Sequence, residues 1–492
     1  MTGADPGSGH PDGVWLATTA GGIVLVRVST VDGVRQVRFD DPVRGLYRQP
    51  GGDDVRLIDP TASLPRPVVD RRPDFDRWCG WYRGDSGPEL LLTHIPEADL
   101  GEPMVLVQQG DAVIRAYPLD ARTLVREDGV EITFEPDHRL TLRRSGDVLG
   151  VLSRTDRVTE EPVEFSAHGV ALRGTLISPS GPGPHPGAVV VHGAAGGQRD
   201  YYRLFVTALL AAGVAALIYD KQGTGTSGGA DRPSIFDQAA AAGAALDLLA
   251  RRSDIGPIGL LGFSNGMWSV PMVAAGRTDL AFVAGIGSPG VSMVDAEVHR
   301  RTTVLRDAGV SEASVAAVAR AWRAVFALDG AGPDPAAELV AELRAALAGV
   351  AGRGDLASYE VPAYAVHNPM LSPLPPSTPV EELLPLLAGP ADPAGAYDPA
   401  PDYARITCPV MLQFGEWDVS VPVAESVRRI HAARPGVTIR VYPGLDHLLN
   451  RPPTGIVGLS AEETMYAYHD FHFGTGVWAD LTGWLRTVTA AP

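Results

Sequence analysis

The sequence has 492 residues, of which 45% are hydrophobic, and it carries 58 acidic against 41 basic side chains. Such a length allows two or three domains with sizeable cores, and the acidic balance argues against nucleic acid and anionic membranes as partners. No apolar run reaches the length of about 18 residues that a bilayer-spanning segment needs.

Two further features concern the compartment in which the protein works. Residues 1–13 are polar and glycine-rich, without the basic flank and apolar core of a signal peptide. Cys79 and Cys408 stand far apart in unlike surroundings, which indicates two reduced thiols rather than a disulfide. We therefore expect a cytoplasmic protein.

The first third of the chain is rich in short β-prone runs. From Val14 to about Asp156 these runs alternate with turns of Gly, Asp and Pro, and long helical periodicity is absent. Clear examples are residues 22–28, 90–93, 104–107 and 112–116. The pattern predicts a separate antiparallel β domain over residues 1–160, either a sandwich or an incomplete barrel. We expect it to serve assembly and stability, with gating or substrate selection as the alternative.

From Val163 onward, strands and helices alternate. The predicted strands are residues 169–176, 188–191, 214–219, 258–261, 281–285, 410–414 and 438–442. The predicted helices are residues 201–212, 234–250, 266–275, 423–433 and 477–487. Such alternation predicts an α/β fold, a mainly parallel, doubly wound sheet covered on both faces. We assign it to residues 161–290 and 402–492.

An insertion over residues 291–401 interrupts this alternation. It holds helix-like pieces at 311–328 and 335–348, then a proline-rich stretch from 362 to 401. It would lie on the side where ligands bind to parallel sheets. The cluster His299-Arg300-Arg301 is a candidate to receive a substrate carboxylate, but a solvated helix face explains it better. Five other side chains are candidates to line an acyl or aromatic pocket, although packing explains each of them better: Trp322, Phe326, Tyr364, His367 and Met370.

A G-x-S-x-G pentapeptide at residues 262–266 places Ser264 directly after the apolar run 255–261. A serine on a tight strand-to-helix turn projects its hydroxyl clear of the backbone, and the flanking glycines let strand and helix pack closely. With 56 glycines in the chain the pattern alone would occur by chance. Its position between a strand and a helix makes Ser264 a candidate nucleophile.

An acid and a base follow in the order that such a nucleophile needs. Asp418 lies just beyond the strand 410–414, and His447 lies just beyond the strand near 438–442. His447 would take the proton of Ser264 as general base, and Asp418 would orient the imidazole. The order serine, acid, histidine is that of the α/β-hydrolase fold, and it differs from the trypsin-like and subtilisin-like orders. Glu416 and Asp446 are the alternative acids.

A small-residue turn completes the candidate site. The strand that ends at Val191 runs into His192-Gly193-Ala194, where backbone N–H groups can approach a ligand. We expect the oxyanion hole to combine the N–H groups of Ala194 and Asn265. His192 is expected to brace the turn rather than to transfer protons.

The chain from about Val163 to its C-terminus resembles α/β-hydrolases of the dienelactone-hydrolase-like and acyl-esterase type. The residues that carry the resemblance are the His192-Gly193 turn, the stretch from Tyr219 to Ser227, the pentapeptide around Ser264, Asp418 with Val421-Pro422, and Asp446-His447. The resemblance implies an α/β-hydrolase fold in which residues 291–401 form a helical cap. It does not cover the first third of the chain.

Two other patterns resemble a cofactor site and a metal site, and we reject both interpretations. Residues 223–228 match the G-x-G-x-x-G of dinucleotide-binding loops, but Gly229 and Pro233 delay the helix that the glycines should open. The segment 466–473 holds two histidines and one aspartate, yet no second cluster of ligands accompanies it. We expect this segment to pack against the final helix, and we expect neither a cofactor nor a metal.

These patterns together predict a serine hydrolase that cleaves an ester or related acyl bond of a small molecule through an acyl-enzyme on Ser264. One alternative is an acyltransferase or cyclase with the same triad, and a second is a non-catalytic, hydrolase-like binding protein. Haloalkane and epoxide hydrolysis are disfavoured, because those relatives carry an aspartate at the position of Ser264. The substrate, the substrate-binding residues and the formation of a homo-oligomer remain open at this stage.

Overall fold

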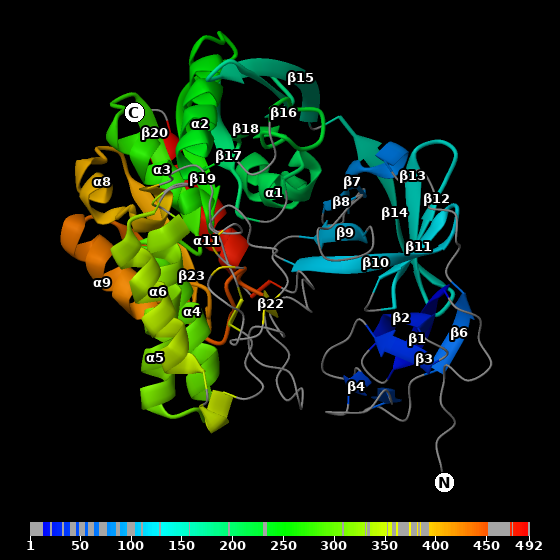
Figure 1. Ribbon diagram of the computed structural model, residues 1–492. Helices are drawn as coiled ribbons and strands as arrows, with labels where there is room; N and C mark the ends of the chain where they lie inside the picture. Colours follow the sequence, from blue (N-terminus) through cyan, green and yellow to red (C-terminus); the bar gives the residue numbers. More distant parts are fainter. Residues whose placement is uncertain are drawn as a thin grey trace.

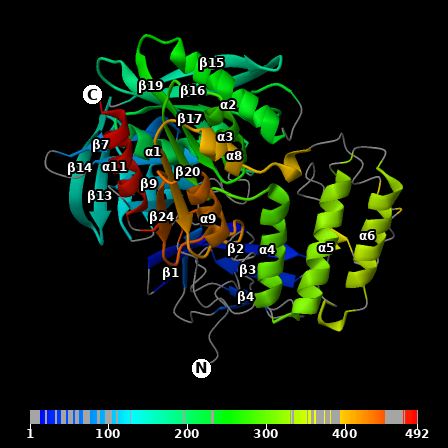
Figure 2. The same ribbon diagram turned by 90° about the vertical axis from the view of Figure 1, so that its left-hand side faces the viewer.

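The structure of the protein is a computed structural model (Figure 1). It describes residues 13–19, 22–31, 34–39, 46–48, 55–57, 63–67, 76–84, 89–95, 104–109, 112–126, 129–156, 158–194, 197–229, 234–307, 309–329, 331, 335–351, 353–356, 361–362, 373–374, 381, 384, 393–450, 473–474 and 476–490. Three groups of elements are visible: β-strands in the first third, a large mixed sheet with helices on both faces, and a set of helices inserted between two strands of that sheet (Figures 1 and 2).

The large sheet has eight strands. They are β15 (Val158–Ala167), β16 (Val170–Pro179), β17 (His185–Val191), β18 (Ala215–Tyr219), β19 (Ile255–Phe263), β20 (Leu280–Ile286), β23 (Val410–Gly415) and β24 (Thr438–Tyr442). Their spatial order is β15-β16-β18-β17-β19-β20-β23-β24. β16 pairs antiparallel with both of its neighbours, and all pairs from β18 to β24 are parallel. This is the sheet of the α/β-hydrolase fold.

Helices cover both faces of this sheet. One face carries α1 (Arg203–Ala211) and α11 (Val477–Thr489), with the short helix η2 (Arg199–Tyr202) before α1. The other carries α2 (Ile235–Ala250), α3 (Gly266–Ala275), α8 (Ala400–Arg405) and α9 (Val423–Ala433). Ser234 caps α2 and forms a reciprocal capping box with Asp237, which fixes where that helix begins.

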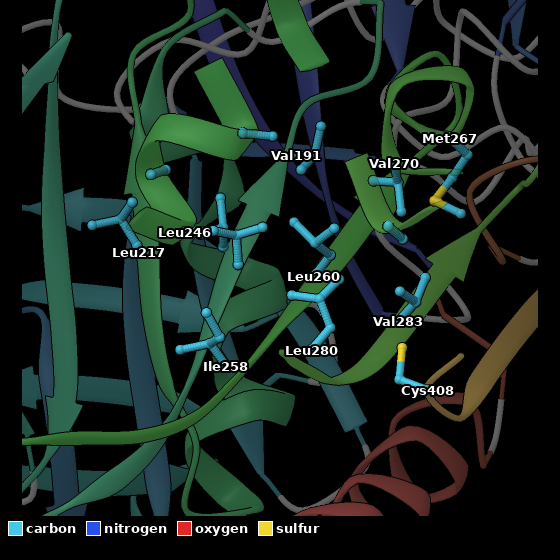
Figure 3. Packing of buried hydrophobic residues seen from close by; sticks show 14 of the residues in the cluster. Val191, Leu217, Leu246, Ile258, Leu260, Met267, Val270, Leu280, Val283 and Cys408 are labelled. Carbon is cyan, nitrogen blue, oxygen red and sulfur yellow. The ribbon is translucent and has the colours of Figure 1, made fainter. Parts of the chain in front are cut away.

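The hydrophobic core therefore consists of two layers, one on each face of the sheet. Successive side chains of a strand point to opposite faces, so Leu260 joins the layer under α2 and α3 while Leu261 joins the layer under α1 and α11. Figure 3 shows the first layer, where Leu246 of α2 and Met267 of α3 meet the strand residues. Burial on both faces explains why β18 is apolar along its length and why β23 is apolar except for the buried Gln413.

The strands of the first third form a closed barrel and a separate sheet. The barrel consists of β7 (Gly80–Arg83), β8 (Leu90–Ile95), β9 (Met104–Gln109), β10 (Ala112–Asp120), β11 (Thr123–Arg126), β12 (Glu131–Phe134), β13 (Arg139–Arg144) and β14 (Asp147–Thr155). The four-stranded sheet consists of β1 (Gly13–Thr19), β2 (Gly22–Val31), β3 (Val34–Phe39) and β6 (Ser63–Pro67). A separate pair is formed by β4 (Leu46–Arg48) and β5 (Val55–Leu57). The short helix η1 (Asp76–Trp78) precedes β7.

Closure of the barrel differs from the sandwich or incomplete barrel that the sequence predicts. The first strand of the barrel pairs with the last, with Tyr82 of β7 opposite Arg154 of β14. Residues so distant in the chain leave no local pattern of their pairing, so only the strands themselves were predictable. The barrel core is apolar and includes Trp78, Tyr82, Leu124 and Phe134.

The insertion lies between β20 and β23. Its main elements are α4 (Met293–Asp307), α5 (Glu312–Asp329) and α6 (Ala337–Val350), which stand side by side in Figure 2. Shorter pieces follow: η3 (Gly354–Leu356), β21 (Val361–Pro362), β22 (Pro373–Leu374) and η4 (Pro393–Ala396). Trp322 and Phe326 belong to the apolar core of the three helices, so they pack inside the insertion. Tyr364, His367 and Met370 lie outside the described residues.

Among the helices that the structure describes, we find none with the length and apolar content that a membrane crossing requires.

Candidate active site

Ser264 occupies the sharp turn between β19 and α3. Its φ of 46° lies in the left-handed region that non-glycine residues rarely adopt, and its N–H donates to the carbonyl oxygen of Ile286 at 2.9 Å. Two residues further on, only a glycine fits at position 266, because a Cβ on Gly266 would collide with the carbonyl oxygens of Val191 and His192. The predicted elbow is thus a strained turn that is held between two strands.

Ser264, His447 and Asp418 form a continuous hydrogen-bonded chain. The Oγ of Ser264 lies 2.7 Å from Nε2 of His447, and Nδ1 of His447 lies 2.7 Å from Oδ2 of Asp418. Because an ionised carboxylate only accepts hydrogen bonds, Nδ1 is the protonated nitrogen and Nε2 is left to accept the serine proton. This is the tautomer that a general base needs.

Asp418 is itself fixed by its own loop. Its Oδ1 accepts hydrogen bonds from the N–H groups of Ser420 at 2.8 Å and Val421 at 2.9 Å, and its side chain is fully buried. These contacts leave Oδ2 for His447 and prevent the carboxylate from turning away. The loop after β23 therefore positions the acid.

The two alternative acids lie elsewhere. Glu416 is exposed, and its Oε2 accepts a hydrogen bond from the N–H of Gly444 at 3.1 Å. Asp446 is buried, but its Oδ1 accepts from the N–H groups of Leu448 and Asn450, both at 2.9 Å. Burial raises the pKa of Asp446 to about 6. The structure thus brings Asp418, rather than either alternative, to His447.

The electrostatics around His447 suit proton transfer. Burial alone would lower its pKa, but the charge of Asp418 and the hydrogen bond to it outweigh burial and hold the pKa above its usual value. The ring also packs closely against the backbone of Gly287, where a Cβ would lie 2.7 Å from Cε1 of His447. Gly287 has a φ of 58°. A glycine after β20 is therefore part of the site, and its conformation is not readable from the sequence.

The turn after β17 lies directly beside the nucleophile. A Cβ on Gly193 would be 3.6 Å from Cβ of Ser264. The N–H of Gly193 donates to the hydroxyl of Tyr202 at 2.8 Å, so it is already used. Within the part of the chain that the structure describes, the N–H groups of Ala194 and Asn265 donate to no backbone acceptor. They are the two donors that the sequence suggests for an oxyanion hole.

His192 braces this turn. Its Nε2 lies 2.5 Å from the carbonyl oxygen of Tyr219, and its own carbonyl oxygen accepts from Nε2 of Gln238 at 3.0 Å. Burial, followed by the charge of Lys221, lowers the pKa of His192 to about 3. The side chain is therefore neutral and structural at neutral pH. Sequence reasoning missed Tyr202 and Gln238, because contacts between separate elements leave no local pattern.

The glycine-rich loop after β18 binds a side chain of the protein itself. Oδ2 of Asp220 accepts from the N–H and the hydroxyl of Thr226, both at 2.9 Å, and Oδ1 accepts from the N–H of Arg199, also at 2.9 Å. The helix that follows begins only at Ile235. Two donors of the loop, the N–H and the hydroxyl of Thr226, are thus directed at Asp220.

The basic cluster on α4 is packed rather than solvated, which corrects the preferred sequence interpretation. Arg300 is only 6% exposed and pairs with Glu297 at 2.6 Å. The guanidinium of Arg301 lies 4.9 Å from the ring centre of Trp322. His299 is half-buried, and burial lowers its pKa while the charge of Asp418 opposes this. Arg300 and Arg301 are therefore packed against other side chains, whereas Arg306, about one turn and a half further along α4, is exposed.

The aromatic segment near the C-terminus is described only at its end. Phe473 packs edge-on against Trp478 of α11, with 4.8 Å between ring centres, and residues 466–472 lie outside the described residues. Within the described residues, histidine, cysteine and carboxylate side chains nowhere gather in threes in a way that could hold a metal ion. Neither Cys79 nor Cys408 forms a disulfide.

No protein-family profile matches the chain, and no curated protein sequence matches it. Among solved structures, the esterase Pf2001 of Pyrococcus furiosus is similar with 15% identity, a TM-score of 0.36, and coverage of 60% of this chain and 85% of its own. A 2,6-dihydroxy-pseudo-oxynicotine hydrolase is similar with 17% identity, a TM-score of 0.38, and coverage of 67% and 68%. Est1E from Butyrivibrio proteoclasticus, solved with ferulic acid bound, has 16% identity, a TM-score of 0.38, and coverage of 66% and 96%. At these TM-scores the likenesses add no argument to the fold, which rests on the strand order.

Proposed function

We propose that the protein is a serine hydrolase that cleaves a carboxylic ester or related acyl bond of a small molecule. The observation that carries the proposal is the hydrogen-bonded chain from Ser264 through His447 to Asp418, with 2.7 Å at each step. A hydroxyl at this distance from an oriented imidazole is an activated nucleophile. The strained turn at Ser264 adds support, because such strain concentrates at functional sites.

The proposed reaction proceeds in two acyl-transfer steps. Oγ of Ser264 attacks the carbonyl carbon while its proton passes to Nε2 of His447, and the negative charge on the carbonyl oxygen is held by the N–H groups of Ala194 and Asn265. The intermediate then breaks its bond to the leaving group, which takes the proton from Nε2. Water then attacks the carbonyl carbon of the acyl-enzyme and passes a proton to Nε2. The bond from that carbon to Oγ breaks, Oγ of Ser264 takes the proton back from Nε2, and the acid is released.

We also propose three units that serve this chemistry: an N-terminal β domain over residues 1–160, a catalytic unit over 161–290 and 402–492, and a cap over 291–401. Separate apolar clusters in the barrel and in the inserted helices support this division. β15 begins at Val158, so its first residues lie before the 160/161 boundary.

A fluorophosphonate probe tests the nucleophile directly. Intact mass would be compared for the native chain, Ser264→Ala and Ser227→Ala, a serine whose hydroxyl donates to the carbonyl oxygen of Asp220. We expect a single adduct on the native chain and on Ser227→Ala, and none on Ser264→Ala. An adduct that persists in Ser264→Ala, or none on the folded native chain, would contradict the proposal.

The acyl acceptor needs a second assay. With p-nitrophenyl acetate as the probe, release of acetate alone in the presence of added alcohols and amines is the expected result. Accumulation of the acetylated acceptor instead of acetate would identify the protein as an acyltransferase.

A further inference from the structure

Lys221 is the only lysine in the sequence, while all its other basic side chains except histidine are arginines. It lies two residues after the end of β18, next to Asp220, and it is only 8% exposed. A lysine is seldom buried unless its ammonium group has partners, since removal of a charge from water is costly. The position of this one amine is therefore informative.

The ammonium group of Lys221 contacts the turn beside Ser264. Its Nζ donates to the carbonyl oxygen of Gly193 at 2.7 Å and to that of Ala194 at 3.2 Å. The loop that contains Lys221 forms two more hydrogen bonds to the chain after this turn. The carbonyl oxygen of Gly197 accepts from the N–H of Lys221 at 2.8 Å and from the hydroxyl of Thr224 at 2.7 Å. Lys221 thus holds the turn from its buried side.

This contact sets the direction of one backbone donor. In a trans peptide the C=O and the following N–H point in opposite directions. The carbonyl of Gly193 points at Lys221, so the N–H of Ala194, in the same peptide unit, points away from it. Gly193 itself lies against Ser264, and its own N–H is committed to Tyr202. The peptide between Gly193 and Ala194 is therefore held with a single N–H directed away from the lysine.

We propose that Lys221 is a positioning residue, whose ammonium group aligns and polarises the Ala194 N–H that binds the oxyanion. This rests on the proposed function of the triad. A charged donor on the carbonyl withdraws electron density from the peptide, which makes the N–H a stronger donor. The compact ammonium, with three rotatable hydrogens, can reach two successive carbonyl oxygens, whereas the planar fork of an arginine suits a different geometry.

Lys221→Met keeps most of the side-chain volume and removes the charge and the donors, so it tests the proposal. Loss of a whole oxyanion donor costs on the order of 10²–10³ in kcat, and a misaligned donor should cost roughly 10–100-fold. With p-nitrophenyl acetate we expect that loss in kcat with KM changed by less than about threefold, because the donor acts in the transition state. Ser227→Ala, on the same loop but away from the turn, is the matched control and should keep kcat.

A second measurement does not depend on a variant. Because the chain has one lysine, labelling with ε-¹⁵N-lysine gives one side-chain amine signal in the native protein. Phenylboronic acid forms a tetrahedral anion on an activated serine, and we expect this signal to shift when it binds. An unshifted signal in a chain that binds the boronate would overturn the proposal, as would a native kcat in folded Lys221→Met.

The two proposals fail in different ways. If the native chain does not react with the fluorophosphonate, the proposed function is wrong. If the native chain reacts and Lys221→Met reacts and turns over at the same rate, only the role of Lys221 is wrong.

Discussion

The barrel and the carboxyl edge of the large sheet bury very different side chains. In the described part of the barrel, the buried polar residues are Thr93, Arg126 and Thr141. At the ends of the large sheet's strands they include His192, Asp220, Lys221, Asp418, Asp446 and His447. Desolvation of so many ionisable groups opposes folding, even where each group has partners.

We infer from this difference that the barrel contributes mainly to stability and that the carboxyl edge of the large sheet carries the proposed chemistry. Arg126 of the barrel contacts Gln109 at 3.2 Å and Thr141 contacts Glu135 at 3.2 Å, around an otherwise apolar core. The sheet edge adds a strained serine at a φ of 46° to its buried charges. Substitutions in the barrel should therefore change stability, and substitutions at the sheet edge should change catalysis.

The strongest test of this separation is Ser264→Ala. We expect kcat for p-nitrophenyl acetate to fall by on the order of 10⁶-fold, because the nucleophile is lost. The thermal unfolding midpoint should change little, since the substitution removes a single hydrogen bond, the one to Nε2 of His447, which contributes about 0.5–1.5 kcal/mol. A fall in stability comparable to that of a core substitution would contradict the separation.

Asp418→Asn should produce the next largest effect. An amide in place of the carboxylate favours the wrong imidazole tautomer, so kcat should fall by about 10⁴-fold with the fold intact. Glu416→Gln is the control and should stay within about twofold of native, because Glu416 is exposed and its carboxylate accepts from the backbone N–H of Gly444 rather than from His447. Comparable losses in both variants would argue against Asp418 as the orienting acid.

The barrel gives the converse prediction. Phe134 is fully buried and stacks on Trp78 with 4.5 Å between ring centres. Phe134→Ala should lower the free energy of unfolding by about 3–5 kcal/mol, measured by denaturant titration. Val148→Ala, at a side chain that is 57% exposed, should change it by less than about 0.5 kcal/mol. A large loss of kcat in folded Phe134→Ala would show that the barrel takes part in catalysis.

The smallest predicted effect is the dependence on pH. His447 accepts a proton only when it is neutral, and its pKa is held above the usual value by Asp418. Therefore kcat/KM should rise about tenfold per pH unit in acid and level off above an apparent pKa higher than about 6.5. In Asp418→Asn the residual activity should level off at lower pH. A native profile that levels off well below pH 6 would contradict the charge assignment.

Local patterns were sufficient to predict the α/β class of the sheet and to propose the residues of the site, but not to predict how the barrel closes. Ser264, Asp418 and His447 each lie just beyond a strand, and their order in the chain is what suggests a triad. The closure of the barrel depends on the pairing of β7 with β14, which no local pattern records. Similarly, the bounds of α4 were not predicted, because the charged run around the buried Arg300 interrupts the apolar stripe that identifies an amphipathic helix.

The insertion between β20 and β23 also has a kinetic consequence. Val283 of β20 pairs with Val410 of β23. These two strands can therefore pair only when the whole chain between them, including the insertion, closes into a loop. Contacts between such distant segments form slowly, because their loop entropy is lost before any contact repays it. Ser264 precedes the insertion, whereas Asp418 and His447 follow it. During refolding, the activity that we propose for the triad should therefore return after the inserted helices and the barrel have already formed.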